Sequence, residues 1–421
     1  MGRRFNIPIF YKSSVLSTLK SARRALDSRS QDMSPSLLDL GVLKLKIARH
    51  FGFCFGVENA IEIAYRALEE NRDKRVFLLS EMIHNPHVNG DLVSRGVRFI
   101  LAPDGTQLIP FSEISPADIV IVPAFGTTVE LFKELRDRGI DPRVYDATCP
   151  FVEKVWKRAA QLGDNGYTII IHGKHTHEET RATFSHARLS GESLVILDLA
   201  EAKLLATYIR REKPFTEFGR DFAGRYSQTF DPAQHLSRIG VVNQTTMLAT
   251  ETQEISNVLR KAMSDYFGGD SAREHFADTR DTLCYATSQN QESIYHLLAD
   301  GGDLAIVVGG YNSSNTSHLV ELCEKKLPTY YIKDADEILS DDEIQYLDLR
   351  TRTVKRCSPW LPKDKSSVTV LLSAGASCPD ALVDQVIYKL ASMFNSQDQI
   401  EPSLAKLSQL VESSVGGAQN V

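Results

Sequence analysis

Three cysteines in the sequence share one local setting, where a strand-like run passes into a helical pattern. Cys54 lies in HFGFCFGVENAI, Cys149 in RVYDATCPFVEKV and Cys284 in DTLCYATSQNQESI. A helix amino end favours thiolate over thiol, and thiolates are the ligands that iron–sulfur clusters need. The repeated setting predicts a cluster gripped between domains, in which three ligands instead of four leave one iron open. Three buried thiols are the alternative, because cysteine is commonly buried.

The other three cysteines lie in different settings. Cys323 falls in the helical pattern HLVELCEKKL and is expected to pack in the core, and Cys357 falls in a basic loop. Cys378, in GASCPD, is the one competitor as a fourth ligand. The paired C-x-x-C spacing of structural zinc sites does not occur. Sparse, widely separated cysteines favour a reducing compartment over a disulfide framework.

Polar loops that follow short apolar runs carry a second chemical signal. They place hydroxyl, amide and imidazole groups beside predicted helix starts, which attract phosphate. Helix capping would explain each Ser or Thr alone, and capping or core packing would explain His84. Their shared position at strand ends favours a diphosphate pocket, whose candidate residues are His84, His177, Thr245, Thr246, Asn312, Ser313, Ser314, Asn315 and Ser377.

The stretch HTHEETRAT supplies the candidate for acid catalysis. Glu179 follows His177 closely, and a carboxyl group beside a histidine and a cluster can be tuned for proton transfer. Glu178 is the neighbouring rival, and stabilisation of a helix amino end is the alternative for both carboxylates. A zinc hydrolase built on His175, His177 and Glu179 lacks the H-E-x-x-H spacing that places two histidines on one helical face.

Alternating strand and helix patterns must position these residues. The apolar runs VFLLSEMI, ADIVIVPA, TIIIH, RIGVVNQ, DLAIVVGG and VTVLLSA each lead into a polar loop and then a helical pattern. This order predicts an α/β fold with small parallel sheets, whose ligand sites lie at the carboxyl ends of the strands. Each cysteine of the repeated setting precedes two such loops. The chain is therefore predicted to contain three similar α/β domains arranged about one axis.

The predicted boundaries give an amino-terminal arm at 1–42, domains at 43–148, 149–281 and 282–392, and a tail at 393–421. The first strand is a candidate for pairing with the third domain. The arm is rich in Arg, Lys and Ser, as transit peptides are. However, four of its apolar residues have the spacing of an ordered helix: Val15, Leu16, Leu19 and Ala22. Residues 205–238 are polar, aromatic and irregular, which indicates an insertion or flap in the second domain, with an exposed surface loop as the alternative.

Composition excludes several classes of protein. The chain has 421 residues, 42% apolar and 24% charged, which is typical of a globular protein with several domains. A net charge of −6 argues against general nucleic-acid binding, while it permits a local basic pocket for an anionic metabolite. Because no run of about 18 apolar residues occurs, no membrane span is expected.

Motifs from about Leu43 to about Leu390 resemble the 4-hydroxy-3-methylbut-2-enyl diphosphate reductases, the LytB-type enzymes that end the non-mevalonate isoprenoid pathway. They are GFCFGVENAIEIA, IHNPHV, DATCPFVEKV, HGKHTHEETRAT, NQTT, DTLCYATSQNQ, GGYNSSNTSHL and SAGASCPD. Each motif alone is weak, but their order makes the resemblance specific. It implies a pseudo-threefold trefoil of α/β domains around a central [4Fe–4S] cluster. The implied ligands are Cys54, Cys149 and Cys284, which leave one iron open to the substrate.

The same resemblance implies the roles of the polar residues. Glu179 would be the proton source, with Thr245 and His177 beside it in the relay. Residues that would hold the diphosphate are His84, Ser313, Ser314, Asn315 and Ser377. Two electrons from reduced ferredoxin or flavodoxin, with two protons, would remove the hydroxyl group as water and leave isopentenyl and dimethylallyl diphosphates. The cofactor would carry the redox step while the protein orients the substrate. An iron–sulfur sensor or regulatory binding module is the alternative function.

Phe125 departs from the family pattern. In PAFGTTVE it occupies the position where many bacterial members have histidine, so one polar contact is missing. The PAFG form, the long arm and the 205–238 insertion resemble the plant and cyanobacterial branch. That branch makes plastid import conceivable, but RRFNIPIFYKSS resembles part of the mature protein, which favours a bacterial cytoplasm. A monomer or homodimer without a nucleic-acid partner is expected.

Overall fold

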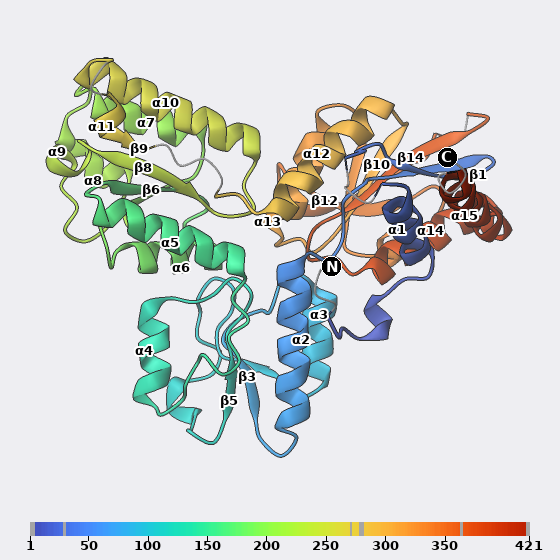
Figure 1. The fold of residues 1–421 in the computed structure, drawn as a ribbon, viewed down its shortest axis with the longest axis horizontal. Helices are drawn as coiled ribbons and strands as arrows, with labels where there is room; N and C mark the ends of the chain where they lie inside the picture. Colours follow the sequence, from blue (N-terminus) through green and yellow to red (C-terminus); the bar gives the residue numbers. More distant parts are fainter. Residues whose placement is uncertain (1–4, 28–30, 270–271, 278–281, 363–364, 418–421) are drawn as a thin grey trace. The chain divides into compact units, whose positions relative to one another are not determined.

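Small parallel sheets covered by helices make up the structure (Figure 1), a computed structural model that describes residues 5–27, 31–269, 272–277, 282–362 and 365–417. The predicted α/β class with small parallel sheets is confirmed. The backbone divides into two compact units. The first unit consists of Met1–Phe55, His84–Pro86 and Ala286–Val421, and the second consists of Gly56–Ile83 and His87–Tyr285.

The first unit contains a five-stranded sheet. Its spatial order is β1 (Ser36–Leu40), β2 (Leu43–Ile47), β14 (Val368–Ala374), β10 (Leu304–Val308) and β11 (Thr329–Ile332). Only β1 and β2 run antiparallel to each other, and β14 pairs in parallel with both β2 and β10. Every residue of β10 is buried, as expected of a central parallel strand covered on both faces. The strand that begins the predicted first domain thus pairs with a strand of the predicted third domain.

Helices and short connecting elements complete the first unit. They are η1 (Ile9–Tyr11), α1 (Val15–Leu26), α13 (Ser314–Glu324), η4 (Ala335–Glu337), α14 (Asp380–Met393), η5 (Gln397–Gln399), α15 (Ile400–Gly417) and most of α12 (Tyr285–Asp300). Helix α1 packs against α14 and α15. Its four predicted apolar residues are all buried, so the ordered helix in the arm is confirmed.

A hairpin of β12 (Ile344–Asp348) and β13 (Thr353–Cys357) also belongs to the first unit. Cys357 was expected in a basic loop, but it is the last residue of β13. Its sulfur lies 3.6 Å from the hydroxyl of Tyr330. The two strands pair antiparallel over five residue pairs, which explains why this basic segment is extended.

The second unit contains a four-stranded parallel sheet in the order β7 (Ser193–Ile196), β6 (Thr168–His172), β8 (Ile239–Asn243) and β9 (Phe276–Ala277). Successive side chains of a strand point to opposite faces. Ile169 and Ile171 therefore pack with α5 (Pro150–Asp164) and α6 (Glu178–Ala187). Ile170 packs on the other face, with α7 (Leu199–Ile209) and α10 (Ala249–Phe267). Figure 1 shows these two helix pairs on either side of the sheet.

Residues 205–238 do not form the exposed surface loop that was the alternative for this segment, and their assignment as an insertion stays a prediction. They contain η3 (Phe215–Glu217), α8 (Phe218–Asp221) and α9 (Pro232–His235). Their aromatic side chains join the core of the sheet's α7 and α10 face, where Tyr208, Phe218, Phe222 and Phe230 are buried. The short helix α11 (Ala272–His275) follows α10. Burial of these rings explains why a polar and irregular sequence forms a packed layer.

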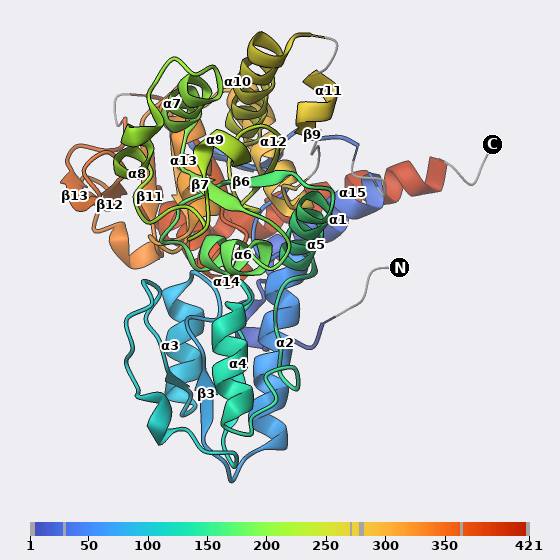
Figure 2. The same ribbon diagram turned by 90° about the vertical axis from the view of Figure 1, so that its left-hand side faces the viewer.

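A second, three-stranded parallel sheet of this unit has the order β4 (Arg98–Phe99), β3 (Val76–Leu78) and β5 (Ile119–Ile121). Figure 2 shows it among α2 (Phe55–Glu70), α3 (Pro86–Ser94) and α4 (Val129–Asp137), and η2 (Phe111–Glu113) precedes β5. Two strand predictions were too long here. VFLLSEMI contributes only three residues to β3, and RVYDAT contributes a single bridge from Asp146 to Val122. Because β3 pairs with β4 and β5 over only a few residues, tertiary contacts determine the length of these strands more than the strand propensity of the sequence does.

Within the described residues, no helix is both long enough and apolar enough to cross a lipid bilayer. Some of the predicted boundaries fall on residues outside that part of the chain: 1–4 and 28–30 in the arm, 281 at the end of the second domain, and 418–421 in the tail. The three domain boundaries and their arrangement about one axis stay predictions.

Candidate active site

Strand pairing in the second unit brings two motif loops together. β6 and β8 are parallel neighbours, with His172 opposite Asn243 at their carboxyl ends. The loop after β6 leads into α6, and the loop after β8 contains Thr245 and Thr246. His177 caps α6, because its Nδ1 accepts the amide of Glu179 at 3.2 Å. A ring nitrogen that accepts a hydrogen bond is unprotonated, so the proton of neutral His177 lies on Nε2.

Glu179 is held by Thr245. The amide of Thr245 donates to Oε1 of Glu179 at 2.5 Å, and the hydroxyl of Thr245 donates to Oε2 at 2.9 Å. The Glu179 residue is only 1% exposed. A buried carboxylate requires such charge-assisted bonds, because desolvation otherwise disfavours its charged form. Glu178, the rival acid, instead bonds to the hydroxyl of Ser80.

Gln244 is a positioning residue that sequence reasoning did not single out. Its Oε1 accepts the hydroxyl of Thr180 at 3.0 Å and the amide of Lys174 at 3.3 Å. Its Nε2 donates to the hydroxyl of Thr246 at 2.7 Å. The side chain thus links the loop after β6 to the loop after β8. The NQTT motif contained this residue, but no spacing in the sequence indicates a buried amide bridge.

Cys149 and Cys284 belong to the same unit as Glu179. Cys149 is the residue before α5 and its amide donates to the carbonyl of Ala124 at 2.9 Å. Cys284 lies directly before α12, and its amide donates to the carbonyl of Thr245 at 3.2 Å. Burial, and to a smaller extent the charges of Cys284 and Glu179, raise the pKa of the Cys149 thiol to about 11. The unit therefore brings both cysteines close to the candidate acid.

Phe125 replaces the polar contact with an aromatic one. Its ring meets the ring of His177 edge to face, with the centroids 5.6 Å apart. Gly126, the next residue, has φ +72°, and a Cβ there would lie 2.4 Å from the ring of Trp156. Trp156 in turn stacks on His186 at 3.8 Å. The loop that carries Phe125 is thus fixed by close aromatic packing.

Cys54 lies in the first unit, directly before α2. Its amide donates to the carbonyl of Ala376 at 3.2 Å, which ties the HFGFCFG loop to the SAGASCPD loop. Gly52 has φ +77°, and a Cβ there would lie 2.4 Å from the carboxylate of Asp380. Only glycine permits both this backbone conformation and this close approach. All three cysteines of the repeated setting thus lie directly before helices, as predicted.

His84 also belongs to the first unit, although the segments on both sides of it belong to the second. Its Nδ1 accepts the side-chain amide of Asn312 at 3.2 Å. Its carbonyl accepts the hydroxyl of Ser377 at 3.1 Å. A Cβ at Gly310 would lie 2.4 Å from the same carbonyl. Three of the predicted diphosphate residues therefore lie together.

The amino end of α13 contributes three further predicted diphosphate residues. Ser313 caps the helix, because its hydroxyl oxygen accepts the amide of Thr316 at 3.2 Å. Ser314 is the first residue of α13. Asn315 is 4% exposed, and its Oδ1 accepts the amide of Ala376 at 2.9 Å. Its Nδ2 is buried without an acceptor in the described part of the chain, so a donor is left over for a ligand.

Cys323, which was expected in the core, and Cys378, the competing candidate ligand, are both packed in the interior. Burial raises the pKa of Cys323 to about 12 and also raises the pKa of Cys378. The sulfur of Cys378 lies 3.6 Å from the carbonyl of Pro379. Both side chains are fully buried, whereas the three cysteines of the repeated setting are half-buried and therefore more accessible to a metal group.

The structure thus places the predicted site residues in two sets. The first unit holds Cys54, His84, Asn312, Ser313, Ser314, Asn315 and Ser377, and the second holds Cys149, Cys284, His177, Glu179, Thr245 and Thr246. No group of three or more His, Cys, Asp or Glu side chains is placed to hold a metal ion within the residues described. Because Cys54 and the other two cysteines belong to different units, the three-cysteine ligand set stays a prediction.

Comparison with known proteins decides the family. Residues 45–391 match the family model described as LytB protein. This chain belongs to the LytB family. The resemblance seen in the ordered motifs is therefore confirmed.

Curated proteins similar to this chain include cyanobacterial ones. A protein of Synechococcus sp. (strain WH7803), named 4-hydroxy-3-methylbut-2-enyl diphosphate reductase, is 39% identical over 85% of this chain and 87% of its own length. A Prochlorococcus marinus (strain MIT 9211) protein of the same name is 40% identical over 85% of this chain and 86% of its own.

A solved LytB structure shares the fold. The structure of E-1-hydroxy-2-methyl-but-2-enyl-4-diphosphate reductase from Plasmodium falciparum has a TM-score of 0.58 and 19% identity. It covers 83% of this chain and 88% of the other chain. The family match begins at residue 45, so the arm that contains α1 precedes the shared LytB region.

The cysteines of this LytB chain fit an iron–sulfur group by their chemistry. All three are half-buried and lie at helix amino ends, which stabilise thiolates. The Cys149 thiol, whose pKa is raised to about 11, keeps its proton at neutral pH unless a cation compensates the charge of the thiolate. Such a site suits iron better than a reactive free thiol.

Proposed function

We propose that the chain is an iron–sulfur reductase that converts 4-hydroxy-3-methylbut-2-enyl diphosphate into isopentenyl and dimethylallyl diphosphates, at the last step of the non-mevalonate pathway. The observation that carries the proposal is the pair of hydrogen bonds from Thr245 to the buried carboxylate of Glu179, in the unit that also holds Cys149 and Cys284. Relatives about 40% identical bear the name of this reductase.

The ligands of the proposed [4Fe–4S] cluster are Cys54, Cys149 and Cys284. Such a cluster would supply electrons one at a time and keep one iron open to the substrate. The proposed electron donor is reduced ferredoxin or flavodoxin, and the proposed location is a bacterial cytoplasm. A monomer or a homodimer would suffice for this activity.

Glu179 is the proposed proton source. The reaction breaks an allylic C–O bond, and the hydroxyl group must take up a proton to leave as water. Two electrons and two protons balance the step. The Thr245 hydroxyl donates to Oε2 of Glu179 in the structure, and a protonated Glu179 would donate its proton in the reverse direction along the same contact. Neutral His177 would add an N–H donor at Nε2.

The diphosphate is proposed to bind at the amino end of α13. Asn315 offers a buried Nδ2 that lacks an acceptor in the described structure. Ser314 is the first residue of α13, and the amino end of a helix attracts phosphate. Ser377 donates to the carbonyl of His84 and would exchange that partner for a phosphate oxygen. These donors explain how a chain with a negative net charge would bind an anionic substrate.

Anaerobic purification tests the proposal most directly. Iron and acid-labile sulfide at about four each per chain, with turnover of the hydroxylated diphosphate by dithionite-reduced protein, is the expected result. An intact cluster without turnover would instead favour a sensor or regulatory module. Stoichiometric zinc without iron would favour the hydrolase, for which His175, His177 and Glu179 form no metal group in the described residues.

Serine substitutions test the ligand set. Cys54→Ser, Cys149→Ser and Cys284→Ser should each lose the visible absorbance of the cluster. Cys323→Ser is the matched control, because that cysteine is fully buried in α13. If all three ligand variants keep a complete cluster and full turnover, the assignment is wrong.

A further inference from the structure

The amino-terminal arm contacts the two aromatic residues that flank Cys54. The ring of Phe5 meets the ring of Phe55 edge to face, with the centroids 4.9 Å apart. The ring of Tyr11, which is 5% exposed, meets the ring of Phe53 at 5.7 Å. Both contacts lie within the first unit. Cys54 is therefore bracketed by two rings that the arm covers.

Lys20 of α1 contacts the same loop at Phe51, two residues before Phe53. Its ammonium donates to the carbonyl of Phe51 at 3.2 Å and lies 4.3 Å from the centre of that ring. It also donates to both carboxylate oxygens of Asp380 at 2.8 Å. Because Asp380 neutralises the ammonium, the effect of Lys20 on the loop is mainly geometric. The cation fixes a backbone carbonyl three residues before Cys54.

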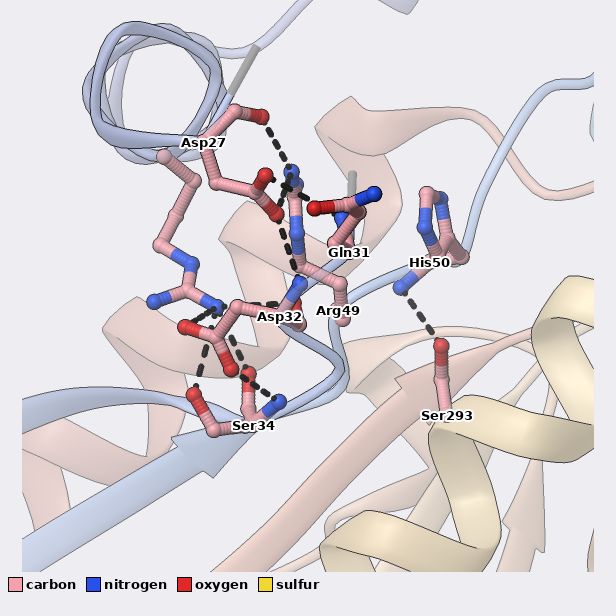
Figure 3. Close-up of polar contacts among 8 residues, drawn as sticks. Asp27, Gln31, Asp32, Ser34, Arg49, His50 and Ser293 are labelled. Carbon is pink, nitrogen blue, oxygen red and sulfur yellow. Dashed lines mark hydrogen bonds and ion pairs between the residues drawn. The ribbon is translucent and has the colours of Figure 1, made fainter. Parts of the chain in front are cut away.

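A polar network ties the start of the loop to the end of α1 (Figure 3). Arg49 forms an ion pair with Asp27 at 3.7 Å, and its side chain is only 7% exposed. The next amide, that of His50, donates to the hydroxyl of Ser293 at 3.0 Å. Asp27 is the residue directly after α1. Both the arm and α12 thus hold the chain where it enters the loop.

The arm is anchored on its other side to α14. Asp384 accepts the amides of Val15 and Leu16 at 3.2 and 3.3 Å, and the Ser13 hydroxyl accepts the amide of Leu16 at 2.7 Å. These bonds satisfy the first amides of α1, which have no partner inside the helix. The arm is therefore a fixed element that can transmit rigidity to the loop.

The contacts follow a regular order. Every second residue of the loop contacts a residue that lies progressively nearer the start of the arm. The pairs are Arg49 with Asp27, Phe51 with Lys20, Phe53 with Tyr11, and Phe55 with Phe5. We propose that residues 5–27 act as a strap that holds the Cys54 loop in its ligand conformation and shields the Cys54 side of the cluster from water. Tyr11 and Lys20 are its main positioning residues. This inference rests on the proposed function, because it needs Cys54 as a ligand.

Two variants test the strap in the anaerobic holoprotein. Tyr11→Leu removes the aromatic contact, and Lys20→Met keeps the aliphatic stem but removes the ammonium. Arg24→Met is the matched control, since Arg24 is an exposed cation on the same helix. Two rates are measured: bleaching of the visible absorbance by an iron chelator, and deuterium exchange of peptides that span residues 50–56. Loss of one such contact should speed both rates about three- to tenfold, and the control should match the wild type.

A third measurement separates positioning from general stability. Water admitted beside Cys54 would stabilise the more negative, reduced cluster, so the midpoint potential should shift to more positive values in both variants. A variant that is merely less stable, with a lower melting temperature, would keep the wild-type potential. Wild-type potential and wild-type rates in both variants would overturn the strap.

The proposed function fails by a different result. If Cys54→Ser retains a complete cluster and turnover, Cys54 is not a ligand, whatever the strap variants do. If Cys54→Ser loses the cluster while both strap variants behave as wild type, only the strap is rejected. Should Tyr11→Leu fail to fold by circular dichroism, Lys20→Met and Phe5→Leu decide the outcome, because those residues are less buried.

Discussion

Thr245 donates hydrogen bonds to both carboxylate oxygens of Glu179, from its amide at 2.5 Å and from its hydroxyl at 2.9 Å. The two oxygens are therefore held in one plane and in one orientation. The hydrogen bond from the backbone amide of Thr245 stabilises the charged carboxylate, but the amide does not transfer its proton during turnover. The hydroxyl both supports the charge and carries a proton that can be transferred. The two bonds therefore have different consequences for catalysis.

Replacement of Glu179 by Gln should remove the acid and keep the shape. Turnover should fall about 100- to 10,000-fold, the range for loss of one general acid, while cluster content and substrate affinity stay near wild type. Steady-state kinetics with dithionite-reduced protein, together with iron analysis, measure both. Glu178→Gln is the control, because that carboxylate bonds to Ser80 instead. Near-normal turnover of Glu179→Gln would remove it from the role.

Thr245→Val should lower kcat, whereas Thr245→Ser should stay close to wild type. Valine keeps the hydrogen bond from the backbone amide to Glu179 but removes the hydrogen bond from the side-chain hydroxyl. Serine keeps both hydrogen bonds. A hydrogen bond to a charged group is worth enough to change kcat by about 10- to 150-fold. The two rates are compared at saturating substrate. If valine and serine have equal rates, the hydroxyl plays no part in proton transfer.

Asn315→Asp should weaken diphosphate binding and leave cluster content unchanged. The new side chain keeps an acceptor for the amide of Ala376 but replaces the Nδ2 donor by a negative oxygen. The KM should rise by at least about tenfold, because one hydrogen bond to an anion is lost and a like charge is added. Asn165→Asp, at an exposed residue, controls for the added charge alone. Equal KM values in the two variants would contradict the assignment.

Gly126→Ala should destabilise the protein more than Gly224→Ala. The two glycines have nearly the same φ, +72° and +71°, so the backbone strain is matched. Only at Gly126 would the new Cβ meet a ring, at 2.4 Å from Trp156, while nothing lies within 4 Å at Gly224. Overpacking should add about 1–3 kcal/mol to the loss of unfolding free energy, measured by urea denaturation. Equal losses would show that Trp156 can move aside.

Asp221 should make the protein less stable in acid. Its hydrogen bond from Lys213, and then that from Tyr208, lower the pKa of the carboxyl from 3.8 to about 2. A pKa that is lower in the folded state means that the stabilisation is present above about pH 4 and is lost as the pH falls towards 2. Melting temperatures across this range should fall less steeply for Asp221→Asn. Asp73→Asn, at an exposed aspartate, should keep the wild-type slope.

The sequence pattern predicted correctly those strands whose residues are apolar because both faces of the strand are buried. TIIIH and VTVLLSA form β6 and β14 because continuous apolar runs suit strands covered on both faces. RVYDAT was also predicted as a strand, but it forms only an isolated bridge, in which Asp146 pairs with Val122. Residues 205–238 look exposed by composition, yet Phe218 and Phe222 find a core formed by α7 and α10. Such partners are distant in sequence, so no local pattern contains them.

The same limit applies to the candidate site. The motifs named Glu179 and Thr245, and the structure joins them. Gln244 was missed, because its role depends on two loops that meet only after β6 and β8 pair. Ser313 and Ser377 were predicted as phosphate donors, but one caps α13 and the other bonds to His84. The sequence indicates which hydroxyl groups lie near the site, and tertiary contacts determine which of them already form hydrogen bonds within the protein.

The bond from the Val15 amide to Asp384 joins residues 369 positions apart in the sequence. β2 likewise needs β14, whereas most of the second unit is encoded between them as one nearly continuous stretch. Ribosomes make the amino end first, so the arm and the Cys54 loop emerge before their partners in β14 and α14 have been made. The second unit can fold during synthesis. We therefore expect any metal centre that uses Cys54 to be assembled only after β14 and α14 have been made.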